Sequence, residues 1–269
     1  KGFEAVAEYR KNFKNQGFFI RGNFSYARNK ILNMDEPSFE GLEWQKQTGR
    51  RLGEYYGLTA VGLFKDWNDI HTSPVQDFAG LVQPGDIKYL DISGDGRIDA
   101  EDQGYLGKVT FPEKILGLAL GYNWKGFDAS VLFQGAFGSN VWLSGPAVWP
   151  FSKFAGVLAD VKGNYFSADN PDPAAKYPRM TSNDQPNNYI NSTFWLKSTD
   201  YVRLKNVEIG YTFSADWIKK ARIQSARLYV NAINLVTWDQ VKIFDPEIPN
   251  GLAKYPQQRV LNAGCTGNF

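Results

Sequence analysis

The densest group of potential metal ligands lies in one loop, Asp91–Asp102, which reads Asp-Ile-Ser-Gly-Asp-Gly-Arg-Ile-Asp-Ala-Glu-Asp. Counted as a loop of twelve, it has oxygen-bearing side chains at positions 1, 3, 5, 9 and 12, a glycine at position 6 and an isoleucine at position 8. This is the spacing of an EF-hand-type calcium loop, in which the carbonyl at position 7 is also a ligand. The predicted ligands are Asp91, Ser93, Asp95, the carbonyl of Arg97, Asp99 and Asp102.

Two features of this loop depart from the EF-hand pattern. Asp102 stands where a longer, bidentate glutamate is usual. The preceding segment, Gly85–Leu90, follows a proline and predicts extended backbone rather than a helix. We expect a bound calcium ion, and the alternative is an acidic, glycine-rich surface turn without a metal.

The composition excludes several other kinds of site. The chain has 269 residues, a net charge of +2, one cysteine and one histidine. A single cysteine, Cys265, excludes an internal disulfide framework and a multi-thiolate zinc site. The single histidine, His71, excludes a His-rich metal site and gives little basis for a Ser-His-Asp triad, and we expect it in a loop beside Ser73. The small net charge gives no argument for a polyanionic partner.

Aromatic residues make up 15% of the chain, yet no apolar run reaches the roughly 18–20 residues of a membrane helix. Instead, apolar and polar residues alternate with a period of two, which predicts β-strands. The predicted strands cover about 3–13, 18–30, 115–124, 127–137, 199–213, 226–236 and 258–269. In the fifth strand the alternation slips near Lys205, which predicts either a β-bulge or a part of the strand beyond a membrane.

The connections between these strands alternate between short and long. Residues 31–113 and 138–197 form the longest connections, and residues 214–220 are predicted to form a capped helical turn. This alternation places short turns at one end and long loops at the other, as in an outer-membrane β-barrel. Because bacterial single-chain barrels close with an even number of strands, seven strands predict a sector of a larger barrel. Cys265 is then a small residue that faces lipid.

Several motifs resemble one family in the family's own order. They are Asn191–Phe213, Leu228–Asp239, Asp245–Glu247, Tyr255–Arg259, Pro84–Tyr89 with the acidic loop that follows it, and Gly62–Phe64. Together they resemble the SusC/RagA-like TonB-dependent outer-membrane transporters of Bacteroidetes. The closing segment, Ala263–Phe269, keeps the family's terminal aromatic residue but has more glycine and a cysteine.

The resemblance implies that residues 1–269 are the C-terminal part of such a transporter, without its plug domain and remaining strands. It implies a plugged barrel of about 22 strands, extracellular loops at 31–113 and 138–197, and no enzymatic activity. It also implies a SusD-like surface lipoprotein that covers the barrel, energy from the TonB complex, and an oligosaccharide or sometimes a peptide as cargo.

In this reading, Arg21, Asn23, Asp128 and Gln134 face the barrel lumen, where plain solvation explains any one of them. Aromatic residues of the second long loop are expected to pack the loop rather than to contact ligand. Calcium would rigidify an extracellular loop that has no core of its own.

Two alternatives stay open. One is a secreted, calcium-stabilised carbohydrate-binding β protein, or a glycoside hydrolase with Asp245 and Glu247 as its two carboxylates. The other is a TonB-dependent siderophore or cobalamin receptor.

Overall fold

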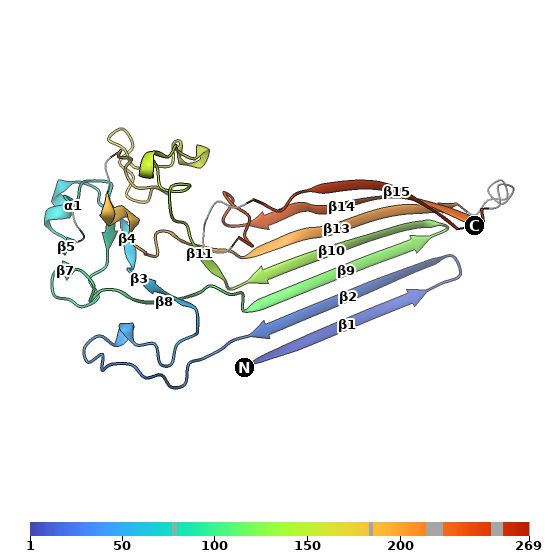
Figure 1. The fold of residues 1–269 in the computed structure, drawn as a ribbon, viewed down its shortest axis with the longest axis horizontal. Helices are drawn as coiled ribbons and strands as arrows, with labels where there is room; N and C mark the ends of the chain where they lie inside the picture. Colours follow the sequence, from blue (N-terminus) through green and yellow to red (C-terminus); the bar gives the residue numbers. More distant parts are fainter. Residues whose placement is uncertain (77, 79, 183–184, 214–222, 249–254, 269) are drawn as a thin grey trace.

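A computed structural model gives the fold of the chain (Figure 1). It describes residues 1–269 except 77, 79, 183–184, 214–222, 249–254 and 269. The predicted helical turn at 214–220 therefore lies outside the described residues. Within the described ranges, no helix is long and apolar enough to cross a membrane.

In the described part of the chain, seven long strands form one antiparallel sheet in the order β1-β2-β9-β10-β13-β14-β15. The strands are β1 (Gly2–Asn12), β2 (Gln16–Ala27), β9 (Lys114–Trp124), β10 (Phe127–Phe137), β13 (Tyr201–Phe213), β14 (Ser225–Asp239) and β15 (Val260–Asn268). Each corresponds to one predicted strand, with ends within three residues of the prediction. The all-β prediction is confirmed, and the sheet is an open sector rather than a closed barrel.

The short connections lie at one end of the sheet and the long ones at the other (Figure 1). Between β9 and β10 the chain turns in two residues, Lys125 and Gly126, both with positive φ (47° and 88°). Two such residues are what a tight hairpin turn requires, and glycine adopts this conformation without steric cost. The described geometry therefore has the asymmetry that the loop lengths predict.

A β-bulge interrupts β13. The pairing of β13 with both neighbours shifts between Leu204 and Asn206, so Lys205 has no partner in either register. A bulge is the first of the two explanations that the slip in alternation suggested, and it is the correct one. Because of the bulge, Tyr201 and Arg203 lie on the same face as Asn206 and Glu208.

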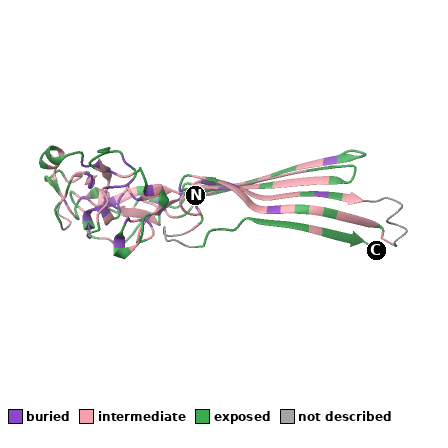
Figure 2. Cartoon of the chain, turned by 90° about the horizontal axis from the view of Figure 1, so that it is seen from above, coloured by how far each residue is buried: buried purple, intermediate pink, exposed green. Residues whose placement is uncertain are grey.

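Register fixes which residues share a face of the sheet. One row across all seven strands is apolar: Tyr9, Ile20, Leu120, Val131, Val207, Ala232 and Leu261. The neighbouring row on the opposite face is largely polar: Arg10, Phe19, Gly121, Ser130, Glu208, Asn231 and Asn262. Many side chains of the apolar row are exposed, among them Tyr9, Ile20 and Leu261, and most strand residues are intermediate or exposed (Figure 2). We call the face that carries the first row the apolar face, and the face that carries the second row the polar face.

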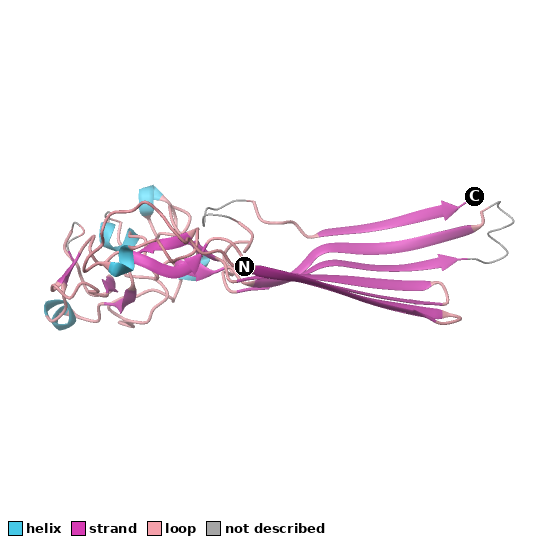
Figure 3. Cartoon of the chain, turned by 90° about the horizontal axis from the view of Figure 1, so that it is seen from below, coloured by secondary structure: helices cyan, strands magenta, loops and turns pink. Residues whose placement is uncertain are grey.

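The long connections fold into a separate lobe beyond the sheet (Figure 3). Its described strands are β3 (Glu54–Gly57), β4 (Ala60–Leu63), β5 (Val75–Gln76), β6 (Ile87–Tyr89), β7 (Arg97–Ile98), β8 (Gly104–Val109), β11 (Asn140–Trp142) and β12 (Leu196–Ser198). Its helical segments are η1 (Glu43–Gln45), α1 (Trp67–His71), η2 (Ser152–Phe154), η3 (Ala159–Val161) and η4 (Pro186–Tyr189). The strands pair as β3-β8, β4-β6, β5-β7 and β11-β12.

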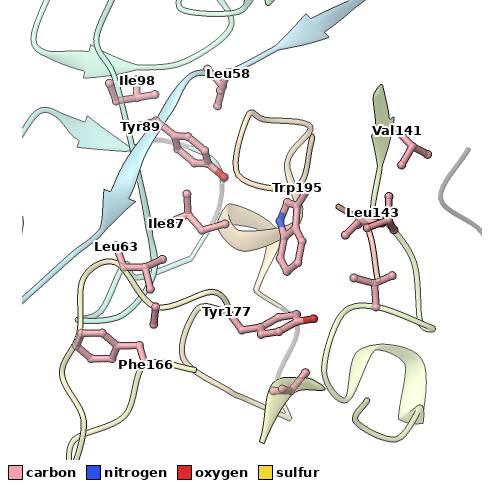
Figure 4. Close-up of a cluster of buried hydrophobic side chains, with 14 residues drawn as sticks. Leu58, Leu63, Ile87, Tyr89, Ile98, Val141, Leu143, Phe166, Tyr177 and Trp195 are labelled. Carbon is pink, nitrogen blue, oxygen red and sulfur yellow. The ribbon is translucent and has the colours of Figure 1, made fainter. Parts of the chain in front are cut away.

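The lobe has a hydrophobic core of its own, drawn in Figure 4. Leu58, Ile87 and Ile98 from the first long connection are fully buried, and Tyr177 and Trp195 from the second are 2% and 3% exposed. The expectation that the extracellular loop carrying Asp91–Asp102 has no core of its own is therefore wrong. Tertiary contacts between the two connections, rather than periodicity within either, create this core.

Buried polar groups also join the two long connections. The carboxylate of Asp86 is fully buried and accepts hydrogen bonds from Arg179 Nε (2.7 Å), Gln185 Nε2 (2.8 Å) and Asn188 Nδ2 (2.8 Å). A buried charge is tolerated when it is paired and hydrogen-bonded in this way. The expectation that His71 lies in a loop is also wrong, because it is the last residue of α1, where its ring stacks on Trp67.

Candidate functional site

Hydrogen bonds from the backbone hold the Asp91–Asp102 loop together. Asp91 accepts from the amides of Gly94 (2.6 Å) and Gly96 (2.9 Å), and fully buried Asp102 accepts from those of Ile92 (2.8 Å) and Asp99 (3.0 Å). Desolvation opposes ionisation of Asp91, but these amide donors outweigh it and lower the pKa of its carboxyl.

The remaining predicted ligands are half-buried (Ser93, Asp99) or exposed (Asp95, Arg97) in the same loop. Asp95 is exposed and accepts from the amide of Arg97 (2.8 Å), while Ser93 donates to Asp91 (3.2 Å) and Asp99 accepts from Glu101 (2.8 Å). Among the described residues, no three Asp, Glu, His or Cys side chains converge as a metal-binding group. The hydrogen bonds give the loop a metal-free explanation, and the calcium ion stays a prediction.

The lobe also gives the loop a support that does not involve an ion. Ile98, at position 8, is fully buried in the lobe core, and β7 pairs with β5. The prediction of extended backbone before the loop is confirmed, since β6 ends at Tyr89. The argument that calcium orders a coreless segment therefore no longer holds.

The four residues predicted to line a lumen share the polar face. Arg21 lies opposite Glu8, with an Nε–Oε2 distance of 4.0 Å, and Asn23 packs over Gly117. Asp128 pairs with Arg227 from β14, which also contacts Glu208 at 2.7 Å. The register brings Arg227, Asp128 and Glu208 together from three strands, and sequence reasoning did not single out Arg227.

Gln134 belongs to a second polar cluster, where the sheet meets the lobe. Its Nε2 donates to the hydroxyl of Tyr201 (3.1 Å), which in turn donates to Glu247 (2.6 Å). Arg203, only 1% exposed, contacts Asp245 at 2.9 Å and Glu247 at 2.5 Å. The bulge at Lys205 makes this cluster possible, because it turns Arg203 and Tyr201 towards the polar face.

Asp245 and Glu247 therefore act as ion-pair partners of a buried arginine. A hydrolase would need one of the two as a proton donor and the other as a free base or nucleophile. Both carboxylates instead form ion pairs with Arg203. This arrangement supports a structural role for both carboxylates.

Next to this cluster lies a cavity of about 330 Å³ between the sheet, the lobe and the segment after β14. We call it the junction pocket. Its walls include Tyr55, Phe111, Ile115, Gln134, Tyr201 and Ile248. Of these only Gln134 was named from the sequence, as a residue that faces the lumen, because the others come together through contacts far apart in sequence.

Some aromatic residues of the second long connection pack the lobe, as expected, and others are exposed. Tyr177, Trp195 and Phe166 are buried in the lobe core, whereas Phe151 is 42% exposed and Phe154 fully so. Burial raises the pKa of the Tyr177 hydroxyl, which also donates to Asp160 (2.7 Å). Most of these rings therefore pack the lobe.

An antiparallel sheet with one apolar and one polar face, short turns at one end and a folded lobe at the other defines a sector of a transmembrane-type β-barrel. Comparison with curated proteins gives the relatives. The chain is 28% identical over 264 residues to TonB-dependent receptor P3 of Formosa agariphila and 27% identical over 275 residues to TonB-dependent receptor P26 of the same organism. These matches cover 92% and 91% of this chain, but only 25% and 26% of the relatives.

Comparison with solved structures gives the same fold. The RagAB peptide importer in its open-open state matches with a TM-score of 0.70 and 19% identity, over 100% of this chain and 28% of that chain. A second structure, of the RagAB peptide transporter, matches with a TM-score of 0.70 and 21% identity, over 100% of this chain and 29% of that chain. No family model matches the chain.

Both comparisons confirm the resemblance that the motifs indicated. The chain is similar in sequence to TonB-dependent receptors and has the fold of part of the RagAB chains. It spans about a quarter of the length of the curated relatives it matches.

Proposed function

We propose that the chain is part of a TonB-dependent importer of the bacterial outer membrane, with the sheet in the bilayer and the lobe on the extracellular side. The observation that carries this proposal is the sheet itself. Its apolar row crosses all seven strands without a charged residue, while charged groups such as Arg227 and Asp128 lie on the other face. Alternation of this kind is typical of strands with lipid on one side and a polar interior on the other.

The proposal extends to the whole transporter. Energy would come from the TonB complex, and a SusD-like lipoprotein would cover the extracellular end, where the lobe lies. The cargo would be an oligosaccharide or a peptide. The likeness in fold to a peptide importer supports peptide as one of these two candidates. This chain would contribute one wall of the lumen and one part of the extracellular rim.

No step of this function makes or breaks a bond in the cargo. The relatives are receptors and transporters, and the two carboxylates closest to a hydrolase pair are bound to Arg203. The role of the polar-face residues is therefore to hydrate and steer cargo. Their ion pairs limit how strongly any one charge attracts it.

Uptake in cells of the source organism tests the proposal. Deletion of the gene should abolish import of the cargo, and collapse of the proton gradient should have the same effect on the intact strain. The protein should fractionate with outer membranes, need detergent for extraction and co-purify with a lipoprotein. Release into the soluble fraction by salt alone would contradict the proposal. A TonB-dependent siderophore or cobalamin receptor would instead purify without a lipoprotein.

A further inference from the structure

The junction pocket has apolar walls that no described residue covers. Phe111 and Ile115 expose 67% and 43% of their surface, and Ala136 and Val141 add small apolar surfaces. Ile115 and Ala136 lie on the polar face of the sheet, where most other positions are polar. An apolar recess within a polar face is a site for an apolar group of a ligand.

The polar groups around the pocket already have partners. The hydroxyl of Tyr55 donates to the carbonyl of Asn140 (2.9 Å), and Ser139 and Thr199 bond each other through their hydroxyls (2.6 Å). The hydroxyl of Tyr201 accepts from Gln134 and donates to Glu247. A sugar ring brings several hydroxyls, each of which needs a partner when it leaves water. This pocket has few partners to spare, so it suits a hydrocarbon side chain better than a sugar.

Among the described residues, the charges of the ion-pair cluster beside the pocket do not balance. Arg203 carries one positive charge, and Asp245 and Glu247 carry two negative ones. Glu247 is the more exposed carboxylate, at 29% against 9% for Asp245, and it lines the pocket. The excess negative charge therefore lies at the edge of the pocket, where it repels an anionic group.

We propose that the junction pocket binds one aliphatic side chain of a peptide cargo and rejects an acidic side chain at the same position. The inference rests on the proposed import function and adds a cargo class to it. The occupant is a peptide because hydrocarbon side chains are regular parts of peptides and not of oligosaccharides.

The test uses the full-length transporter purified in detergent with its lipoprotein. Three fluorescent peptides of one length carry Leu, Gly or Glu at the same position, and their binding is measured by anisotropy. The Leu peptide should bind about tenfold more tightly than the Gly peptide, a typical effect of one buried aliphatic group. The Glu peptide should bind more weakly than both.

Variants locate the effect. Ala136→Trp fills the pocket and should remove the preference for Leu over Gly, whereas Ala119→Trp, on the same face of the adjacent strand but outside the pocket, should keep it. Ile115→Ala removes one wall of the pocket and should reduce the preference for Leu over Gly. This variant provides the test if the Ala136→Trp protein fails to assemble. Glu247→Gln should weaken the rejection of the Glu peptide.

An unchanged ratio of Leu to Gly binding in both Ala136→Trp and Ile115→Ala overturns the inference. Cells that import an oligosaccharide but no peptide also overturn it, and the proposed import function then stands. Cells that import neither cargo contradict the import function itself.

Discussion

The sheet and the lobe are built on opposite principles. Among described residues, the core cluster lies almost wholly in the lobe, while the sheet has only a few buried side chains, such as Ala232 and Arg203. The sheet exposes Tyr9, Ile20 and Leu261 on its apolar face. A lobe with its own core is stabilised by burial from within. The sheet depends on what surrounds it, because exposed apolar rows and open strand edges need lipid and further strands.

The largest expected effect comes from removing the centre of the lobe core. Trp195 is 3% exposed, donates to the carbonyl of Asn188 (2.6 Å) and contacts Phe194, Tyr177 and Trp149. Trp195→Ala should destabilise the lobe by about 3–5 kcal/mol, the usual cost of such a truncation. Hydrogen exchange of the full-length protein should increase across the lobe and stay unchanged in the sheet.

Phe154→Ala is the matched control, since this aromatic residue of the same connection is fully exposed. Its effect should stay within roughly 0.5 kcal/mol. Faster exchange in the sheet after Trp195→Ala would show that lobe and sheet form one cooperative unit.

A charge on the apolar face should have the next largest effect. Val131 lies in the middle of β10 in the apolar row, and Ser130 precedes it on the polar face beside Glu208. Val131→Arg should cost about 2–4 kcal/mol, the range for a cation near the middle of a bilayer. Ser130→Arg should cost much less. Denaturant titration of the full-length protein refolded in lipid vesicles measures both, and equal costs would contradict the assignment of the faces.

Sequence reasoning succeeded where structure follows from local period. Alternation placed all seven strands and even indicated the bulge at Lys205, because each face of a strand has one environment. Local periodicity did not predict the lobe, because contacts such as that of Asp86 with Arg179 join residues 93 positions apart. The spacing of Asp91–Asp102 identified the loop and placed the apolar Ile98 at position 8, but it did not predict which residues form the core that Ile98 enters.

Calcium should have a smaller effect, confined to the lobe. If the predicted ligands bind the ion, calcium at about 100 times its dissociation constant stabilises the bound form by about 2.7 kcal/mol. Amides of residues 91–102 should then exchange more slowly with calcium than with a chelator. Asp91→Ala should remove the difference, and Asp160→Ala, outside the loop, should keep it. Identical exchange with calcium and with a chelator would leave the loop as a metal-free turn.

The smallest expected effect is on the acid stability of the lobe. Hydrogen bonds from Lys176 and Tyr177 lower the pKa of Asp160 in the folded state. A lowered folded pKa adds stability above the unfolded value, near 3.9, and this stability is lost as pH falls through the folded pKa. Asp160→Asn should therefore flatten the loss of lobe stability below about pH 4. Asp169→Asn, at an exposed aspartate of the same connection, is the matched control, and thermal melts at several pH values compare the two variants.

The central claim is that one face of the sheet contacts lipid and the other does not. Single cysteines at successive positions from Phe127 to Phe133, in a full-length protein with Cys265→Ser, can carry a fluorophore in vesicles that contain quencher-labelled lipids. Quenching should alternate with a period of two, strong at odd positions such as Val131 and weak at even ones such as Ser130. Equal quenching at both sets of positions would contradict the claim that this sheet is a sector of a membrane barrel.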